Sequence, residues 1–336
     1  MLNFSQKANQ TINKYLSIKE TNRLAIGIIF KDGTRDFFVS ENADAKTEFD
    51  IGSISKTFTA ALILKLISEG KLSLDARADE YIDLPKGIYP KISQLLTHTA
   101  GYWHFTPAEI TIPALLKKRY SVANLYRRVT EKNVIKCLAR RNKTRENSSY
   151  GYSDFAYAIL AIIASRVTGV PFFELLDGFI KDELKLSKSY VAKPFRKDVS
   201  YLSKKAIPSW HWERSNPYVS GGGIVSNIVD MTDYMALQLK EDISFIKDSH
   251  KVFEAAFSKK SNIGCALGWH TYKNSNQLWH VGGVGTYRSS MIFNVKRGIG
   301  ITVLGNASGR RSANVHYLAK LLYSEIRRNK LHTNKK

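Results

Sequence analysis

The fold is decided around residues 49–60, which read FDIGSISKTFTA and place a serine and a lysine three positions apart at the start of a predicted helix. Residues i and i+3 lie on the same face of a helix, so the side chains of Ser53 and Lys56 are expected within hydrogen-bond reach. A serine hydroxyl becomes a nucleophile when a base takes its proton, and burial lowers the pKa of a lysine so that it can be that base.

The spacing alone does not identify this pair. Ser-x-x-Lys occurs three times, at Ser53/Lys56, Ser68/Lys71 and Ser244/Lys247. The second pair spans Gly70, which predicts a helix end and a surface turn, and the third follows two acidic residues, which predicts an exposed helix. The first pair alone is preceded by a glycine, Gly52, and followed by a long apolar helix. The glycine allows another backbone to approach closely, and the N–H groups at a helix N-terminus favour a developing negative charge.

Length and composition describe a globular protein without metal chemistry. The chain has 336 residues, 43% of them hydrophobic, which is enough for a large core in one composite domain or two. Cys137 and Cys265 lie among apolar neighbours and are expected to be buried free thiols. No Cys/His pattern with zinc spacing and no His-Glu-x-x-His motif is present. We therefore expect neither a metal nor a cofactor.

Charge and targeting signals suggest the surroundings of the protein. The net charge of +22 favours anionic partners, and residues 115–146 carry eleven Lys or Arg against two Glu. We interpret segment 115–146 first as a solvated helix face, the alternative being a contact with an anionic polymer or membrane surface. No motif predicts a specific nucleic-acid partner. Residues 1–20 lack a secretory-signal pattern and no apolar run has transmembrane length, which favours a cytoplasmic protein over an exported mature form.

Hydrophobic patterning predicts strands at both ends of the chain and helices between them. The expected strands are 23–30, 34–40, 278–281, 286–294 and 299–306. The expected helices are 4–16, 54–68, 92–96, 110–118, 122–128, 134–140, 155–168, 172–184, 228–239 and 313–327. The predicted fold class is α/β of the α+β kind, with one antiparallel sheet built from the N- and C-terminal strands and flanked by helices. We expect one domain from 1–73 plus 241–336, an inserted helical domain at 74–240, and an active site between them.

Two further polar stretches have the residue types that catalysis needs. The loop before helix 155–168 contains Tyr150 and Tyr152, each either a packing residue or a proton carrier beside a lysine, and Asp154, which can be a helix N-cap. Residues 279–285, WHVGGVG, end one strand and turn into the next. Their glycine N–H groups can bind an oxyanion, and His280 is either structural or the source of a hydrogen bond or positive charge. The glycines of residues 220–223 form either a flexible loop or a site of close approach.

Taken together, these stretches resemble the class C β-lactamases and the related DD-peptidases and family VIII esterases. The elements that carry the resemblance follow family order: 51–56 (nucleophile motif), 93–102 (Leu-Leu-x-His-x-Ser-Gly), 152–154 (Tyr-x-Asn), 221–226 (glycine segment), 267–269 (Gly-Leu-Gly-Trp strand) and 280–282 (Lys-Thr-Gly or His-x-Gly). With the flanking strands and the closing helix, the resemblance covers residues 24–322.

The resemblance implies roles for individual residues. Ser53 would be the acylated nucleophile, and Lys56 and Tyr152 would share general base and acid duty. Tyr152 is preferred over Tyr150 because the family places an aromatic residue two positions before its catalytic tyrosine. The N–H groups of Ser53 and Gly283 would form the oxyanion hole. The substrate would be bound by three further residues, namely Asp154, His280 and Gly282.

Three positions depart from the family pattern. Asp154 replaces an asparagine, His280 stands where efficient class C β-lactamases have lysine, and the Pro-Gly that precedes the tyrosine loop is absent. The resulting expectation is a metal-free serine hydrolase that acts on a small-molecule or peptide-like ester or amide through an acyl-enzyme. The alternative is a catalytically weakened binding or regulatory module of the penicillin-binding type.

Overall fold

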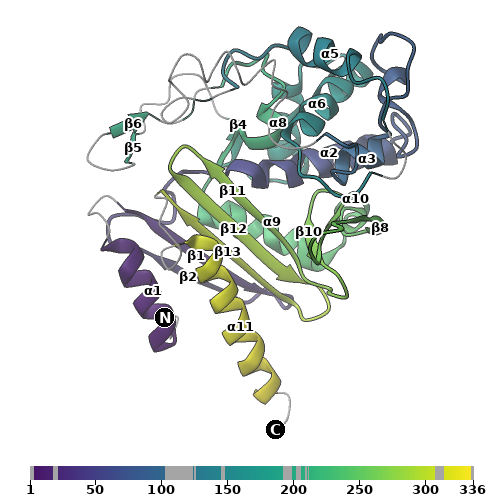
Figure 1. Cartoon of the computed structure of the whole chain (residues 1–336). Helices are drawn as coiled ribbons and strands as arrows, with labels where there is room; N and C mark the ends of the chain where they lie inside the picture. Colours follow the sequence, from purple (N-terminus) through teal and green to yellow (C-terminus); the bar gives the residue numbers. More distant parts are fainter. Residues whose placement is uncertain are drawn as a thin grey trace.

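The architecture was obtained as a computed structural model, shown in Figure 1. It describes residues 4–17, 22–102, 124, 126–144, 148–191, 199–201, 206–208, 210, 212–306 and 314–333. An antiparallel sheet occupies the centre, two terminal helices lie across one of its faces, and most of the remaining helices gather beyond one end.

The central sheet is antiparallel and has eight strands in the order β2-β1-β13-β12-β11-β10-β9-β8. The strands are β1 (Leu24–Phe30), β2 (Arg35–Val39), β8 (Val252–Phe257), β9 (Ile263–Ala266), β10 (His270–Tyr272), β11 (Leu278–Val284), β12 (Tyr287–Asn294) and β13 (Ile299–Gly305). Because β1 pairs with β13, the two ends of the chain meet inside one sheet, as the strand pattern predicted.

Helices cover both faces of this sheet, which explains why β1 is apolar throughout. Helices α1 (Gln6–Leu16) and α11 (Val315–Thr333) lie on one face with Ile26 and Ile28 beneath them (Figure 1). Helix α9 (Ile228–Lys240) packs on β1 and β13 from the other face. Gly27 permits this contact, because a Cβ there would lie 2.2 Å from Thr232 Oγ1 on α9.

The helical part of the molecule is built around two buried helices, α2 (Ser55–Ser68) and α6 (Asp154–Thr168), which pack against each other. Both are apolar on nearly every side, as expected of core helices. Around them lie α3 (Ile92–Leu96), α5 (Glu131–Ala139), α7 (Phe172–Gly178), η3 (Phe179–Glu183), α8 (Val219–Gly222) and α10 (Ser244–Asp248). The short elements are η1 (Gly52–Ile54), η2 (Ala78–Glu80), β3 (Phe49–Asp50), β4 (Tyr190–Val191), β5 (Val199–Tyr201), β6 (Ala206–Pro208) and β7 (Ile224–Ser226).

Within the described residues no single helix is long and apolar enough to cross a membrane. Helices α6 and α7, extended through η3, reach that length and composition only as a pair that bends by 85°. The residues of α6 are part of the main hydrophobic core, so its apolar character is explained by packing inside the protein.

Several expectations from the sequence need correction. Strands β8, β9 and β10 were missed, and residues 267–269, compared above with a family strand, form the tight connection between β9 and β10. Of the expected helix 122–128, residues 126–128 form a turn and most of the rest lies outside the described residues, as does the expected helix 110–118. The division into domains at 73/74 and 240/241 stays a prediction. Two contacts cross the predicted division: α9, from the inserted part, contacts the sheet, and α2, from the sheet part, contacts α6.

Candidate active site

Ser53 lies in η1, directly before α2, where the chain is held by two neighbours. The Ile51 N–H donates to the Ile224 carbonyl at 3.1 Å, and Ser289 Oγ on β12 donates to the Ile51 carbonyl at 2.6 Å. Gly52 has a φ of 53°, and a Cβ at this position would lie 2.5 Å from the Gly283 nitrogen on β11. The glycine before the serine is therefore required both by its left-handed backbone and by the strand against it, as the sequence suggested.

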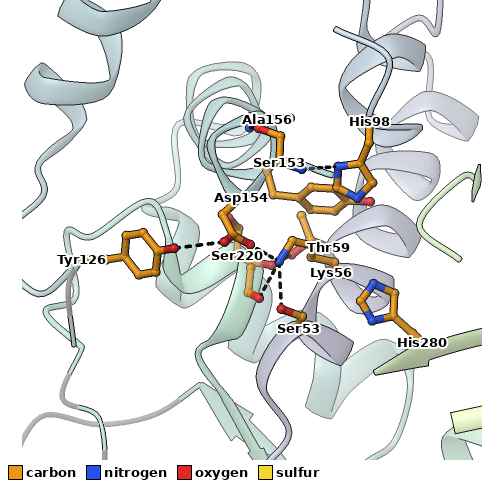
Figure 2. Close-up of polar contacts among 12 residues, drawn as sticks. Ser53, Lys56, Thr59, His98, Tyr126, Ser153, Asp154, Ala156, Ser220 and His280 are labelled. Atoms are coloured by element: carbon orange, nitrogen blue, oxygen red, sulfur yellow. Dashed lines mark hydrogen bonds and ion pairs between the residues drawn. The ribbon is translucent and has the colours of Figure 1, made fainter. Parts of the chain in front are cut away.

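Lys56 is fully buried and contacts three different elements, as Figure 2 shows. Its Nζ donates to Ser53 Oγ at 3.2 Å and to the Gly221 carbonyl at 2.9 Å, and it forms an ion pair with Asp154 Oδ1 at 2.5 Å. Burial lowers the pKa of Lys56, and the charge of Asp154 opposes that shift without cancelling it. The glycine segment is thus a site of close approach, because a Cβ at Gly221 would lie 3.0 Å from Nζ.

The other two Ser-x-x-Lys pairs lie at the surface, as predicted. Ser68 and Lys71 are exposed at the end of α2, and Ser244 and Lys247 are exposed on α10. In the first pair the lysine is fully buried, lies 3.2 Å from the serine oxygen and pairs with a carboxylate, whereas both members of each of the other two pairs are exposed.

Asp154 is the first residue of α6, but it is not the N-cap. Ser153 takes that role, since its Oγ accepts from the Ala156 N–H at 3.2 Å. The Asp154 side chain is left to pair with Lys56, and its Oδ2 accepts from the Tyr126 hydroxyl at 3.0 Å (Figure 2). Tyr126, which sequence reasoning missed, lies stacked on Tyr218 with ring centroids 4.4 Å apart.

Tyr152 lies beside this ion pair, with its ring centroid 4.9 Å from Lys56 Nζ. Burial and then the charge of Asp154 raise the pKa of the Tyr152 hydroxyl well above its usual range, while a hydrogen bond with Ser53 opposes the shift. The hydroxyl is therefore protonated at neutral pH. Tyr150 contacts a different residue, since its hydroxyl lies 3.2 Å from His270 Nδ1.

His98 holds the loop on both sides of Tyr152 and was not identified as a site residue from the sequence. Its carbonyl accepts from the Gly151 N–H at 2.8 Å, and its Nδ1 accepts from the Ser153 N–H at 3.1 Å. Its ring lies 4.7 Å from that of Tyr152. His98 has a φ of 58°, a conformation unusual for a residue other than glycine. The one signal in the sequence was its place in the family-like segment 93–102.

His280 faces this cluster from β11 and is buried (Figure 2). Its Nδ1–H donates to the Val281 carbonyl at 2.9 Å, and its ring stacks on that of His270 at 4.6 Å. Burial, reinforced by His270 and Lys56, lowers the pKa of His280 well below its usual range. Of the two contributions left open above, the geometry therefore favours a hydrogen bond over a positive charge. Within the described residues no group of three or more His, Cys, Asp or Glu is placed to hold a metal ion.

The glycines of β11 pack directly on η1. A Cβ at Gly282 would lie 1.9 Å from the Ile51 carbonyl oxygen, so this glycine lets the strand lie against the chain that carries the serine. Gly283 follows at the exposed position of the same strand, next to Gly52. The fold therefore brings the β11 residues beside Ser53, while the roles suggested for Gly282 and Gly283 stay predictions.

Comparisons with known proteins identify relatives of this chain. Protein flp of Staphylococcus aureus (strain MW2) is 23% identical over 310 residues, which are 86% of this chain and 58% of that protein. A beta-lactamase of Providencia stuartii is 24% identical over 204 residues, 58% of this chain and 48% of that protein. The chain thus spans less than two thirds of the length of these relatives.

A solved structure shares the fold. The octameric penicillin-binding protein homologue from Pyrococcus abyssi superposes with a TM-score of 0.76 at 22% identity, covering 95% of this chain and 76% of the other. The family description "Beta-lactamase" matches residues 19–324, nearly the whole chain. With the fold, the hydrogen-bonded Ser53–Lys56 pair and this match in agreement, the chain belongs to the beta-lactamase family.

Proposed function

We propose that the protein is a serine hydrolase that forms an acyl-enzyme on Ser53 with an ester or amide substrate. The observation that carries the proposal is the buried Lys56 Nζ, 3.2 Å from Ser53 Oγ and paired with Asp154. A serine hydroxyl with a base in hydrogen-bond reach, and a third group that orients the base, is the arrangement that activates a nucleophile. Membership of the beta-lactamase family supports the same class of chemistry.

The proton movements follow from the pKa shifts. Because burial lowers the pKa of Lys56, its neutral form can take the proton from Ser53 Oγ as the oxygen attacks the carbonyl carbon. Asp154 then stabilises the ammonium that forms. Tyr152, which is protonated at neutral pH, donates its proton to the leaving group and recovers one from Lys56. Water attacks the acyl-enzyme in the second half of the reaction, and the same groups run in reverse.

The carbonyl oxygen needs donors as it gains negative charge. The N–H groups of Ser53 and Gly283 are the proposed oxyanion hole, and the close contact of Gly52 with β11 supports this assignment. Loss of one such donor costs about 3–4 kcal/mol of barrier in enzymes where it has been measured. Asp154, His280 and Gly282 are proposed to line the substrate side.

A substitution series tests the proposal. The unsubstituted protein should release p-nitrophenol from p-nitrophenyl esters, with an initial burst equal to the concentration of sites and an acyl adduct visible by intact-protein mass spectrometry. Ser53→Ala should show neither, and Tyr152→Phe should slow both the formation and the loss of the adduct. An undiminished burst in Ser53→Ala would exclude the mechanism. A parallel incubation with a penicillin and a D-Ala-D-Ala ester would separate lactamase, peptidase and esterase activities.

The Asp154 carboxylate also supports a second candidate, a site that binds ligands without turning them over. A carboxylate 2.5 Å from Nζ favours the ammonium form of Lys56, which cannot accept a proton. Saturable binding of a β-lactam or ester without any covalent adduct would favour this candidate. Formation of an adduct in the natural protein, and its absence in Ser53→Ala, would exclude it.

We further propose that segment 115–146 contacts an anionic polymer or membrane surface. Part of the segment lies outside the described residues, but Arg127, Arg128, Lys132, Lys136 and Arg140 are exposed. Binding to anionic vesicles should weaken as salt is raised, because exposed charges are screened within about 10 Å at 0.1 M salt. Binding that does not depend on salt would contradict this contact.

A further inference from the structure

His280 presents an unused hydrogen-bond acceptor next to the candidate nucleophile. Its Nδ1–H is committed to the Val281 carbonyl at 2.9 Å, so its Nε2 carries the lone pair. Nε2 is buried and has no hydrogen-bond partner within the described part of the chain. Figure 2 shows the ring beside Ser53 and Lys56, and its centroid lies 6.5 Å from that of Tyr152. A buried acceptor without a partner is costly, and a substrate group that donates to it would remove that cost.

Among the described residues, the charged groups around His280 leave no unpaired cation for a substrate anion. Lys56 is paired with Asp154 at 2.5 Å. The rings of His270 and His98 are buried, and protonation of His280 is opposed by both and by Lys56. In the described part of the chain, these three histidines and the Lys56–Asp154 pair therefore offer no unpaired positive charge on this side of the site.

The nearby Arg288 does not change this balance. It pairs with Gly283 on β11, and successive strand residues point to opposite faces, so Arg288 and His280 lie on different faces of the sheet. Its Nη1 donates to the carbonyls of Gly285 and Tyr287, which folds the side chain over the β11–β12 turn.

From this geometry we infer that His280 Nε2 accepts a hydrogen bond from the substrate, and that the site selects neutral, donor-bearing esters or amides over substrates with a carboxylate at that position. The inference rests on the proposed serine hydrolase function and names its substrate class. A carboxylate has only acceptor oxygens, so it cannot form a hydrogen bond with the Nε2 lone pair, and both acceptors would stay without a donor. Sites that lose a required hydrogen bond discriminate strongly, so we expect at least a tenfold difference in kcat/KM.

Three depsipeptides with the same acyl group test the inference. Their leaving group is 2-hydroxypropanoic acid as the free carboxylate, the primary amide or the methyl ester. The amide donates a hydrogen bond, the methyl ester neither donates nor carries charge, and the carboxylate only accepts. We expect kcat/KM to fall in the order amide, methyl ester, carboxylate. Equal values, or a preference for the carboxylate, would overturn the inference while leaving the hydrolase function intact.

Two substitutions and one binding measurement complete the test. His280→Lys introduces a cation and should reverse the ratio of carboxylate to amide turnover, whereas His280→Gln, which both donates and accepts, should bring the ratio toward unity. An unchanged ratio in both variants would contradict the role of His280. Calorimetric titration of Ser53→Ala with the same compounds needs no turnover. Tighter binding of the amide supports the inference and equal binding refutes it, even if the natural protein hydrolyses none of the three.

Discussion

Replacing Asp154 by asparagine should destabilise the fold and change the state of Lys56 at the same time. Lys56 is fully buried and its ion-pair partner lies 2.5 Å away, so Asp154→Asn removes this carboxylate partner while keeping the shape of the side chain. Removal of one partner from a buried ion pair costs about 3–5 kcal/mol. The largest destabilisation to expect from Asp154→Asn is the cost of deprotonating Lys56 instead, because neutralising a lysine of ordinary pKa 10.5 at pH 7 costs about 5 kcal/mol.

The sign of the pH dependence separates this cause from simple loss of packing. In the variant, the folded-state pKa of Lys56 falls further below 10.5 than in the natural protein, because burial is no longer opposed by Asp154. Between the folded pKa of the variant and the higher folded pKa of the natural protein, only the variant gains stability as pH rises, by about 1.4 kcal/mol per unit, because its folded state has already lost a proton that the unfolded chain still binds. The difference in unfolding free energy between the natural protein and the variant should therefore be smaller at about pH 9.5 than at pH 7. The acid limb of the pH–rate profile for acylation should also move to lower pH.

Urea unfolding of the natural protein and Asp154→Asn at the two pH values, followed by tryptophan fluorescence, measures the deficit. Tyr126→Phe is the matched control, since it removes one hydrogen bond to the same carboxylate, made at 3.0 Å, but keeps the charge. Its cost should be about 1.5–3 kcal/mol and independent of pH over this range. A deficit below about 1 kcal/mol for Asp154→Asn, or one that is equal at both pH values, would refute the reasoning.

Substitutions at three other positions test the supporting structure. Gly282→Ala places a Cβ 1.9 Å from the Ile51 carbonyl oxygen and should lower the free energy of unfolding, measured in urea, by about 3 kcal/mol or more. A loss under about 1 kcal/mol would show that β11 does not pack on η1 as described. His98→Ala should lower kcat about 10- to 100-fold with KM little changed, because the loop that carries Tyr152 loses its support. His98→Asn should recover part of the lost kcat. Equal kcat in the natural protein and both variants would exclude the positioning role of His98. Stability should fall on acidification from pH 7 to pH 5. Burial lowers the pKa of His270 from 6.5 to about 3, so below about pH 6.5 only the unfolded chain takes up the proton of this ring. His270→Gln should reduce the slope of unfolding free energy against pH by about 1.4 kcal/mol per unit, and an unchanged slope would contradict a buried neutral ring.

The serine–lysine pair and the sheet built from both termini could be predicted because each depends on a local pattern. The pairing of Ser53 with Lys56 follows from helical spacing, and the glycine before the serine predicted a close backbone approach, which β11 makes in the structure. Strands β11, β12 and β13 contain seven or eight residues each and are bounded by glycine-containing turns, so their patterns were readable. Strands β9 and β10 have only four and three residues, which is too short for a periodic signal.

The partners of the site depend on tertiary packing and could not be predicted by spacing. Tyr126 meets Asp154 across 28 residues of chain, and His98 meets Ser153 across 55. Asp154 carried a misleading signal, since aspartate is common at N-caps, but the neighbouring Ser153 occupies that position. The neutral state of His280 depends on burial between two strands and the helical part, which no local pattern records.

The central claim, that Ser53 is the activated nucleophile, is tested most directly by mapping a covalent adduct. The folded protein is treated with a fluorophosphonate, digested, and the modified peptide is sequenced by mass spectrometry. Activation by the buried Lys56 predicts a single phosphonyl group on Ser53, formed in the natural protein and absent from Ser53→Ala. Labelling of another residue, equal labelling of Ser53→Ala, or no adduct at all in the folded natural protein would contradict the claim.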